Sequence, residues 1–325
     1  MTLKGFDPKW KNFPDYIFGV TKEIWEDRGI STLNQYYAPD IVVRSPSSVV
    51  IGNQGVIAAT LSTLSEFPDR ELLGEDVIWS GAAEEGDLLS SHRLLSTATH
   101  ANTGVYGPAT GKHLTYRIIA DCAARNNQIY DEWLVRDQGA IVRQMGWDPK
   151  TYAVNLIKRE GGPENCVKPL TLKTDLKGDY NGHGNNPVLG QHHADIMNRI
   201  MTAELSVVPK EYDRAVHLKL PGGVTAHGWR SIDQFWLSLR AAFPNAKFQI
   251  DHQIGREDPM MPPRSALRWS LHGIHEGWGA FGQPTGAEVY VLGISHAEFG
   301  PWGLRREYVL YDETAIWKQI ALKTG

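Results

Sequence analysis

The sequence predicts an α+β protein built from two tandem copies of one domain. The first observation is an internal repeat: the segment from Arg93 to Gln144 pairs, position by position and without a gap, with the segment from Arg268 to Gln319, and 12 of the 52 pairs are identical. The second is the order of patterns in each copy, where helical periodicity comes first and strand-like segments follow. Two copies are too few for a solenoid, so we interpret the repeat as a duplicated domain.

Each copy begins with a helical pattern, over Tyr16 to Tyr37 in the first and Ala194 to Tyr212 in the second. A second helix is expected over Gly55 to Glu66 and, in the second copy, over Ser231 to Ala242. Both second helices run into a Phe-Pro pair. Proline ends a helix because it lacks the backbone N–H and its ring clashes with the preceding turn.

Strand patterns fill the rest of each copy. A short strand is expected to end at Pro46 and at Pro221, ahead of the second helix. A run of hairpin-linked strands after the helices favours an antiparallel sheet with one face packed on them. The expected strands are Glu71 to Trp79, Leu89 to Thr99, Lys112 to Cys122 and Gln128 to Arg136, then Lys247 to Ile254, Ser265 to Ile274, Ala287 to Ala297 and Leu304 to Tyr311.

These patterns divide the chain into domains at residues 1–158 and 192–325, joined by a linker at 159–191. The linker is rich in Gly, Asn, Pro and Lys and lacks periodicity. At its end, His192 and His193 begin a predicted helix, but adjacent histidines lack the i, i+4 spacing of a helical metal site. We therefore expect them to be exposed and expect no metal site.

Composition excludes several classes of protein. A net charge of −4 disfavours a nucleic-acid partner, which needs clustered Lys and Arg. No run of 18 apolar residues predicts a membrane span, and the N-terminal residues lack the apolar core of a secretory signal. The two cysteines, Cys122 and Cys166, cannot build a disulfide framework. We expect a cytoplasmic protein.

An ordered set of motifs resembles the SnoaL-like polyketide cyclases of the NTF2-like superfamily. In the first copy the set is Tyr36-Tyr37-Ala38-Pro39-Asp40, Phe67-Pro68-Asp69, Thr99-His100, Asp131-Glu132-Trp133 and Asp137 to Gln144. The second copy repeats it as Tyr212-Asp213, Phe243-Pro244-Asn245, Ile274-His275, Glu307-Tyr308 and Asp312 to Gln319.

The resemblance implies two tandem NTF2-like domains. Each would be a cystatin-like cone, a curved antiparallel sheet wrapped around N-terminal helices, with a deep and largely apolar pocket at its mouth. Members of the family usually dimerise through the outer sheet face. A duplicated chain is therefore expected to form an intrachain pseudo-dimer, and a further homodimer remains open.

The sequence departs from the family at the position of the catalytic aspartate. Cofactor-free cyclases resembling this chain carry an Asp directly after the Trp of the last-strand motif. Here Leu134 follows Trp133, and Val309 follows Tyr308. An aldol cyclisation that depends on this Asp is not expected in either copy.

Strand alternation nominates other pocket residues. If position 134 faces the pocket, residues two positions away do so as well, which selects Glu132 as an acid or base and Arg136 as a substrate contact. Desolvation raises the pKa of a carboxylate in an apolar cavity, which suits proton transfer near neutral pH. The alternative is a structural salt bridge between Glu132 and Arg93, which we otherwise assign to substrate binding. The counterparts in the second copy are Glu307, Tyr311 and Arg268.

His100 and His275 lie where a strand gives way to a glycine-containing loop that resembles the pocket rim of the family. A histidine beside a pocket can shuttle protons, but one near the surface can also serve only to hold a loop by hydrogen bonds. Both readings stay open. Tyr106, in the first of these loops, is a candidate substrate contact.

Asp121 and its counterpart His296 differ between the copies. Duplicated domains can divide their labour, so a mismatched polar pair is a candidate for catalysis in one copy. A His or Asp in an apolar cone could abstract a proton next to a carbonyl group or assist a dehydration. The structural alternative for Asp121 is a strand-end residue that caps loop amides.

Aromatic residues are dense in the second copy. Trp269, Trp278 and Phe281 are candidate ligand contacts, because aromatic residues around a pocket favour a flat or hydrophobic organic molecule. For Trp278 the alternative is packing between the domains.

The sequence therefore predicts a cofactor-independent enzyme of the lyase, isomerase or cyclase type. No Gly-rich nucleotide-binding motif and no nucleophile elbow occurs. The expected substrate is a small hydrophobic or aromatic carbonyl compound, transformed by general acid–base catalysis. The alternative is a non-enzymatic module for binding a small molecule or for association. A cavity lined by carboxylates over an apolar floor would favour the enzyme.

Overall fold

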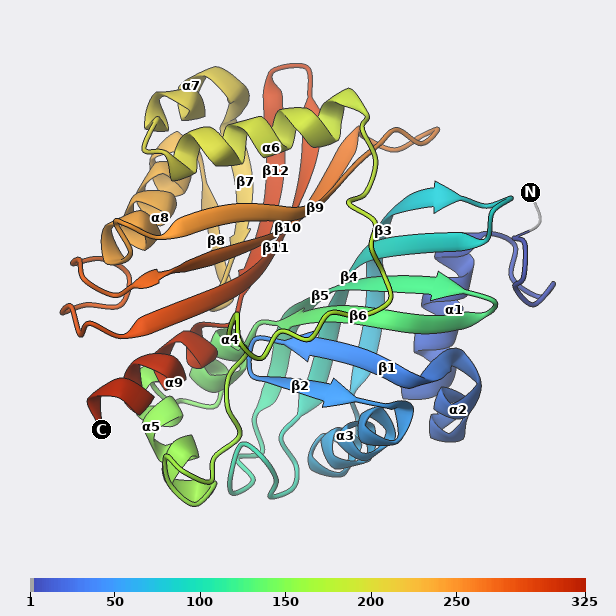
Figure 1. The fold of residues 1–325 in the computed structure, drawn as a ribbon, viewed down its shortest axis with the longest axis horizontal. Helices are drawn as coiled ribbons and strands as arrows, with labels where there is room; N and C mark the ends of the chain where they lie inside the picture. Colours follow the sequence, from blue (N-terminus) through green and yellow to red (C-terminus); the bar gives the residue numbers. More distant parts are fainter. Residues whose placement is uncertain (1–2) are drawn as a thin grey trace.

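The computed structural model describes residues 3–325 and contains two six-stranded sheets, each with its own helices (Figure 1). The strand order is β2-β1-β6-β5-β4-β3 in the first sheet and β8-β7-β12-β11-β10-β9 in the second. The two orders are the same once the strands of each domain are counted from its start. The predicted pair of tandem α+β domains is therefore confirmed.

The first domain starts with α1 (Phe13–Trp25), a 3₁₀ turn (Ile30–Thr32) and α2 (Leu33–Tyr36). The single helix expected over this region is interrupted because Arg28 adopts a positive φ of 58°. The remaining elements are β1 (Tyr37–Ser45), β2 (Ser48–Ile51), α3 (Asn53–Glu66), β3 (Glu71–Ala82), β4 (Asp87–Thr99), β5 (His113–Arg125), β6 (Gln128–Arg136), α4 (Gln138–Gln144) and α5 (Pro149–Arg159).

The second domain follows the same order from α6 (Val188–Met201), which begins inside the segment predicted as linker. Pro187 stands at its N-cap, where the fixed φ of proline suits a helix start. The other elements are a 3₁₀ turn (Leu205–Val207), α7 (Val208–Glu211), β7 (Tyr212–Leu220), β8 (Val224–His227), α8 (Trp229–Ala242), β9 (Lys247–Arg256), β10 (Arg264–Ile274), β11 (Glu288–Gly300), β12 (Gly303–Tyr311) and α9 (Glu313–Thr324).

Both sheets are mixed, and in this they differ from the expected antiparallel form. β1 runs parallel to β6, with Val43 opposite Glu132, and β7 runs parallel to β12, with Leu218 opposite Glu307. The other neighbours are antiparallel. The parallel pair forms because β1 comes early in the chain and joins the sheet beside its last strand. The sheet therefore gains a hairpin, β1–β2, whose residues Val43 and Ser48 line the cavity described below.

Each sheet has two distinct faces, which we name by the residues of β6 and β12. The inner face of the first domain carries Glu132, Leu134 and Arg136, and the outer face carries Trp133 and Val135. On the outer faces, the guanidinium of Arg93 lies 3.5 Å from the ring centroid of Tyr308, and that of Arg268 lies 3.6 Å from the ring centroid of Trp133. The internal repeat relates these two pairs to each other, so the two outer faces meet through equivalent contacts.

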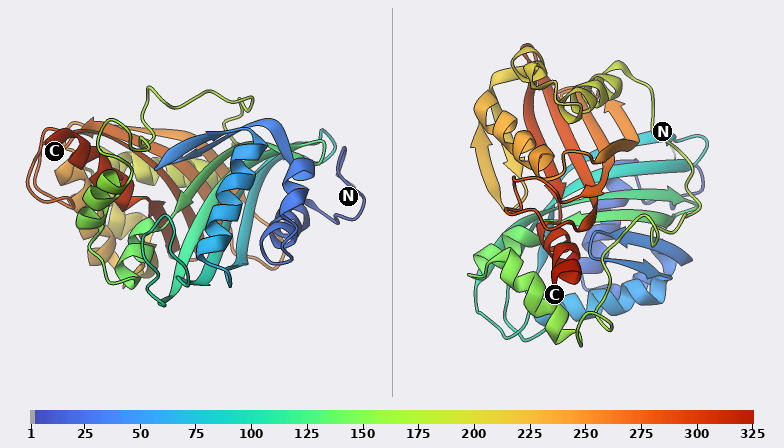
Figure 2. Two further views of the ribbon diagram at one scale, coloured as in Figure 1. Left: turned by 90° about the horizontal axis from the view of Figure 1, so that it is seen from below. Right: turned by 60° about the vertical axis from the view of Figure 1, so that its left-hand side comes forward.

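Two segments tie the domains together (Figures 1 and 2). The chain between α5 and α6 crosses both sheets: Arg44 Nε donates to the Leu176 carbonyl at 2.8 Å, and Tyr180 Oη lies 2.8 Å from His252 Nε2. Helix α9, at the end of the second domain, packs against α5 of the first. The first domain therefore has part of its surface made by the last helix of the second.

The prediction for the adjacent histidines is wrong for His193. Its side chain is fully buried, with Nδ1 2.8 Å from Ser265 Oγ and Nε2 3.5 Å from Glu307 Oε1. The cause is the amphipathic pattern of α6, which turns His193 toward the sheet and leaves His192 half-buried at the surface. Within residues 3–325 no group of three or more potential metal ligands comes together.

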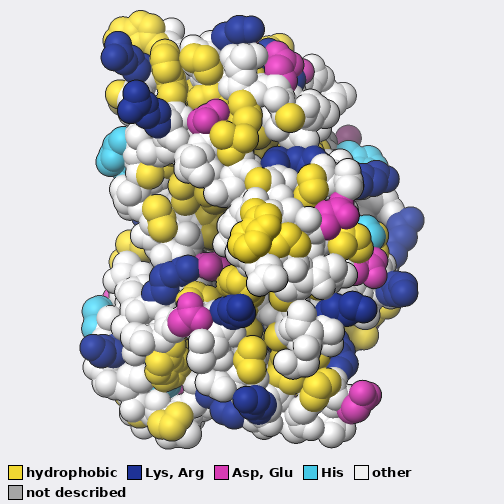
Figure 3. All heavy atoms as spheres, turned by 90° about the vertical axis from the view of Figure 1, so that its left-hand side faces the viewer, with side chains coloured by type: hydrophobic (Ala, Val, Ile, Leu, Met, Phe, Trp, Pro, Cys, Tyr) yellow, Lys and Arg dark blue, Asp and Glu magenta, His cyan; other side chains and the backbone are white. Residues whose placement is uncertain are grey.

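The surface and the helices agree with the charge pattern of the sequence. On the face shown in Figure 3, Lys and Arg side chains are interspersed with Asp and Glu and do not gather into a basic patch. Over the part of the chain that the structure describes, the helices fall short of the length and apolar character needed to cross a bilayer.

Candidate functional site

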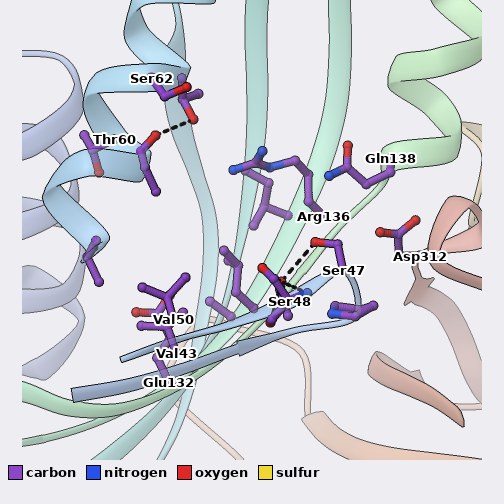
Figure 4. A pocket seen from close by; sticks show the side chains of 18 of the residues that line it. Val43, Ser47, Ser48, Val50, Thr60, Ser62, Glu132, Arg136, Gln138 and Asp312 are labelled. Atoms are coloured by element: carbon purple, nitrogen blue, oxygen red, sulfur yellow. Dashed lines mark hydrogen bonds between the residues drawn. The ribbon is translucent and has the colours of Figure 1, made fainter. Parts of the chain in front are cut away.

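A cavity of about 420 Å³ lies inside the first domain, between α3 and the inner face of the sheet (Figure 4). This volume is within the usual range for pockets that hold small organic ligands. Figure 4 shows Thr60 and Ser62 on one side, Arg136 on the other, and Glu132 beside Val43. Most of the lining is apolar, with a few polar groups placed among aliphatic side chains.

The two domains differ in side-chain volume at two positions that border this cavity. In the first domain, Thr60 of α3 and Leu94 of β4 line the cavity. At the equivalent positions of the repeat, the second domain has Trp236 and Trp269, which are fully buried with ring centroids 6.0 Å apart. The two indoles fill the space that stays open in the first domain. Chemistry on a bound molecule is therefore expected in the first domain.

Glu132 of β6 places a carboxyl group in the wall of the cavity. Its side chain lines the cavity and is 6% exposed, and its Oε2 has no hydrogen-bond partner among the described residues. Burial raises the pKa of Glu132 to about 7, and the charge of Asp131 adds to the rise, whereas the hydroxyl of Tyr37 opposes it. The carboxyl group can therefore exchange a proton at neutral pH.

The alternative that Glu132 forms a salt bridge with Arg93 is wrong. Arg93 is on the outer face, where its Nε donates to Glu75 Oε2 at 2.9 Å. Glu307 is likewise separate from Arg268, whose Nη1 donates to Asp121 Oδ2 at 2.8 Å. Across each sheet, the register aligns the arginine with the residue three positions after the glutamate. Because strand residues alternate between the two faces, the arginine and the glutamate lie on opposite faces.

Two arginines lie on the cavity wall: Arg70, just before β3, is buried, and Arg136 of β6 is half-buried. Arg70 is 1% exposed, its Nε donates to Tyr116 Oη at 3.1 Å, and its guanidinium lies 4.3 Å from the ring centroid of Trp25. Arg136 contacts the hydroxyl of Tyr106. Arg70 was missed by the sequence analysis, although one signal was present: the equivalent residue of the second copy is Ala246.

Part of the cavity lining comes from the second domain. Lys318 of α9 donates to Glu160 Oε2 at 2.5 Å, and both residues line the cavity. Asp312, also in the lining, accepts hydrogen bonds from the amides of Thr314 and Ala315 and so caps α9. Burial raises the pKa of Asp312 to about 6.

His100 holds a loop and does not face the cavity. Its Nδ1 accepts from the Thr110 amide at 3.2 Å, so Nε2 carries the proton that is shared with Glu66 Oε1 at 3.0 Å. Glu66 also accepts from the amides of Val105 and Tyr106. This arrangement matches the alternative in which the histidine organises the rim loop.

His275 has the same link to its loop, with Nδ1 3.0 Å from Thr285 Oγ1. The residue equivalent to Glu66 is Ala242, and Nε2 of His275 has no hydrogen-bond partner within residues 3–325. Phe243 and Phe281 pack around its ring, so the imidazole contacts aromatic side chains of its own domain.

The mismatched pair Asp121 and His296 lies between the domains. Asp121 accepts from Arg268, and His296 Nδ1 lies 3.1 Å from Arg93 Nη1. Both side chains are almost fully buried on the outer faces. Each one contacts the equivalent arginine of the other domain. The structure therefore brings these residues together with the two arginines and leaves them outside the cavity.

The remaining candidates of the second domain are distributed through its core and surface. Glu307 is fully buried and accepts from Tyr212 Oη at 3.1 Å. Tyr311 stacks on Phe235, and Trp269 belongs to the same core. Trp278 is 70% exposed, which removes the alternative of packing between the domains.

Two further residues of the lining belong to the site. Tyr106, nominated from the sequence, lines the cavity, and its hydroxyl donates to Gln138 Oε1. His92 was not nominated: it lines the cavity on β4, and burial lowers its pKa to about 4. At neutral pH His92 is therefore uncharged, and its Nδ1 lies 3.1 Å from Ser90 Oγ.

Comparison with known proteins supports the family assignment of the first domain. Residues 17–145 match the model of the SnoaL-like polyketide cyclase family. No curated protein matches the chain.

Solved structures of similar fold each cover one domain of this chain. IdmH from Streptomyces antibioticus, described as a candidate polyketide cyclase, is 21% identical, covers 41% of this chain and 97% of its own, and has a TM-score of 0.35. A candidate polyketide cyclase from Acidithiobacillus ferrooxidans is 20% identical, with coverages of 41% and 92% and a TM-score of 0.36. A candidate SnoaL-like cyclase from Jannaschia sp. CCS1 is 12% identical, with coverages of 42% and 96% and a TM-score of 0.36.

The family match covers the helices and strands that surround the cavity, and the second domain repeats their order. This chain therefore has two tandem domains of the same strand order, and the first of them matches the SnoaL-like polyketide cyclase family over residues 17–145.

Proposed function

We propose that the first domain is a cofactor-independent acid–base enzyme, of lyase, isomerase or cyclase-like type, and that Glu132 is its catalytic base. The observation that carries this proposal is the combination of a cavity of about 420 Å³ with a buried carboxyl group whose pKa lies at about 7. A base with this pKa is half ionised at neutral pH, where it can both accept and return a proton.

The apolar lining supports a hydrophobic or aromatic carbonyl compound as substrate. Leu134 stands where related cyclases carry their aspartate, and it contributes aliphatic surface at that point of the cavity. Glu132, two residues earlier on the same face, offers a carboxylate at a different depth. A C–H group next to a carbonyl could lose its proton there, and the enolate would then be protonated at another carbon or expel a leaving group.

We infer that the second domain serves the first by association. Its core contains many aromatic side chains, and the segment that ends in α9 supplies Asp312 and Lys318 to the lining of the cavity. It would thus take the position that a second subunit occupies in a dimer of single-domain relatives.

A generic proton-abstraction substrate tests the assignment of Glu132. In 5-nitrobenzisoxazole, a base removes the proton on the carbon next to nitrogen while the ring N–O bond breaks, and a coloured cyanonitrophenolate is released. We expect the wild-type rate to rise with pH through about 7, following the ionisation of Glu132. Glu132→Gln should lower that rate by about 100-fold, the lower end of the usual effect of general base catalysis.

Glu307→Gln is the matched control, because Glu307 is the equivalent residue in the domain whose interior is filled. This variant should keep the wild-type rate. Equal rates for wild type and Glu132→Gln, with both folded by circular dichroism, would reject the enzyme and favour the non-enzymatic binding module.

A further inference from the structure

We propose that the ligand of this cavity carries a carboxylate, which Arg70 and Arg136 bind together. The inference rests on the proposed function for its location in the first domain and goes further by naming the chemical class, a hydrophobic organic acid. Its basis is a pair of arginines on one wall of the cavity, neither of which forms a salt bridge with a carboxylate within residues 3–325.

The two guanidinium groups are unusually placed for arginine. Arg70 is 1% exposed, and within residues 3–325 its Nη1 and the Nε of Arg136 have no hydrogen-bond partner. In the same part of the chain, their hydrogen-bonding neighbours are the uncharged side chains of Ser96, Tyr116 and Tyr106. Burying a charged group without an ion-pair partner costs free energy. The positive charge on this wall of the cavity would therefore be stabilised by an anionic ligand.

Tyr116 shows that the two charges act at one place. Although burial raises the pKa of Tyr116, the nearby charges of Arg70 and Arg136 lower it, and the net result lies below its ordinary value of 10.0. The side chain is almost fully buried between them. The same field that favours a phenolate at Tyr116 favours the anion of a ligand that reaches the two arginines.

The carboxylates of the lining form no ion pair with the arginines because each has another partner, although the charge of Asp312 acts on Arg136 and helps to raise its pKa. Glu66 accepts two backbone amides of the rim loop, Glu160 pairs with Lys318, and Asp312 caps α9. Glu132 lies four residues before Arg136 on β6, which separates their Cα atoms by about 13 Å in an extended strand. An organic acid whose carboxylate is bound by Arg136 would therefore reach Glu132 with a carbon atom that is several bonds away from the carboxylate.

Guanidinium groups bind carboxylates through charge-assisted and often bidentate hydrogen bonds, which amides cannot reproduce. The isosteric pair 2-naphthoate and 2-naphthamide isolates this contribution, because the two probes share shape and apolar area. We expect wild-type protein to bind 2-naphthoate at least tenfold more tightly than 2-naphthamide at pH 7.5, as measured by isothermal titration calorimetry.

Variants of the two arginines test the site. Arg136→Met should abolish the preference while retaining affinity for 2-naphthamide, and Arg136→Lys should restore part of it. Arg70→Met should have the same effect, and Arg70→Gln provides a second variant in case the loss of contacts to Ser96 and Tyr116 unfolds the protein. Arg125→Met is the matched control: Arg125 lies on β5 outside the cavity lining, where it pairs with Asp179, so this variant removes an arginine from the same sheet and should keep the tenfold preference.

The outcomes separate this inference from the proposed function. A preference for 2-naphthoate that survives in Glu132→Gln but is lost in the arginine variants supports the acid-binding site whether or not Glu132 transfers protons. Wild-type protein that binds both probes equally, or neither, overturns the inference. Persistence of the preference in both arginine variants overturns it as well, even where the benzisoxazole reaction depends on Glu132.

Discussion

The indole ring of Trp269 occupies the space next to Gly293 where any larger residue would place its Cβ. A methyl group added at Gly293 would lie 2.2 Å from Trp269 Cζ2. Trp269 also donates through Nε1 to Ser295 Oγ at 3.0 Å. At the three equivalent positions of the first copy, the chain has Leu94, Ile118 and Ala120, and these residues line the cavity.

This relationship predicts strong coupling between positions 269 and 293. Gly293→Ala alone should lower the free energy of unfolding by about 3 kcal/mol, because the tightly packed indole cannot move away. In a Trp269→Leu background the same change should cost much less, giving a coupling of at least about 1 kcal/mol in a double-mutant cycle. Urea unfolding of the four proteins measures it, and additive effects would contradict the packing argument.

Filling the first domain should remove ligand binding. Thr60→Trp places on α3 the residue that fills the second domain at position 236, and Thr60 lines the cavity. We expect at least a tenfold loss of affinity for 2-naphthoate by calorimetry. Leu61→Trp is the control, because Leu61 is the next residue of the same helix and is 53% exposed. Unchanged affinity in Thr60→Trp would mean that the ligand binds elsewhere.

The raised pKa of Glu132 predicts that this residue destabilises the fold at alkaline pH. Its pKa rises from 4.5 to about 7 on folding. Between these values the folded protein retains a proton that the unfolded chain has released, so this contribution to stability falls as pH rises through that window. Glu132→Gln removes the difference. As the pH rises from 5 to 8, the free energy of unfolding of the variant should increase relative to that of wild type by roughly 2–3 kcal/mol.

Urea unfolding of both proteins at the two pH values measures this gain. A variant whose stability relative to wild type is the same at pH 5 and pH 8 would show that Glu132 does not titrate in this range. Because Gln cannot ionise, the comparison needs no correction for a new titratable group at this position.

Asp137 is expected to hold the domains together. Its carboxylate accepts from the amide of Ala140 and from those of Gly222 and Gly223 in the second domain, at 2.8 to 3.0 Å. Asp137→Ala leaves three amides without this partner and should cost about 2–4 kcal/mol of unfolding free energy. Asp148→Ala, which removes an exposed cap within α5, should cost only about 1 kcal/mol. Equal losses would argue against an interdomain role.

The candidate site was partly predictable, and the strand pattern determined which part. Alternation along β6 correctly placed Glu132, Leu134 and Arg136 on one face, because the side-chain period of a strand depends only on local geometry. Arg70 was missed because it comes from the turn before β3, where no periodicity gives its direction.

Other assignments failed for a different physical reason. His100 has a side chain that can transfer protons, but its two ring nitrogens are hydrogen-bonded to Glu66 and Thr110. No local sequence pattern indicates these two partners. Asp121 and His296 were selected because they differ between the copies, but the difference serves two equivalent contacts between the domains. Partners that are distant in the sequence decide these roles, as the contact between Arg93 and His296 illustrates.

The amino-acid sequence by itself determined the duplication, the order of helices and strands, and the face on which each strand residue lies, because these follow from repeats and local periodicity. Only the tertiary structure decided that the first domain encloses a cavity of about 420 Å³. That outcome depends on whether Thr60 and Leu94, or Trp236 and Trp269, fill the space under the sheet. The tertiary structure also brought Asp312 and Lys318 into the lining of a cavity that lies inside the other domain. The cavity and its lining depend on side-chain volume and on contacts between distant parts of the chain. The contact of Lys318 with Glu160 is an example.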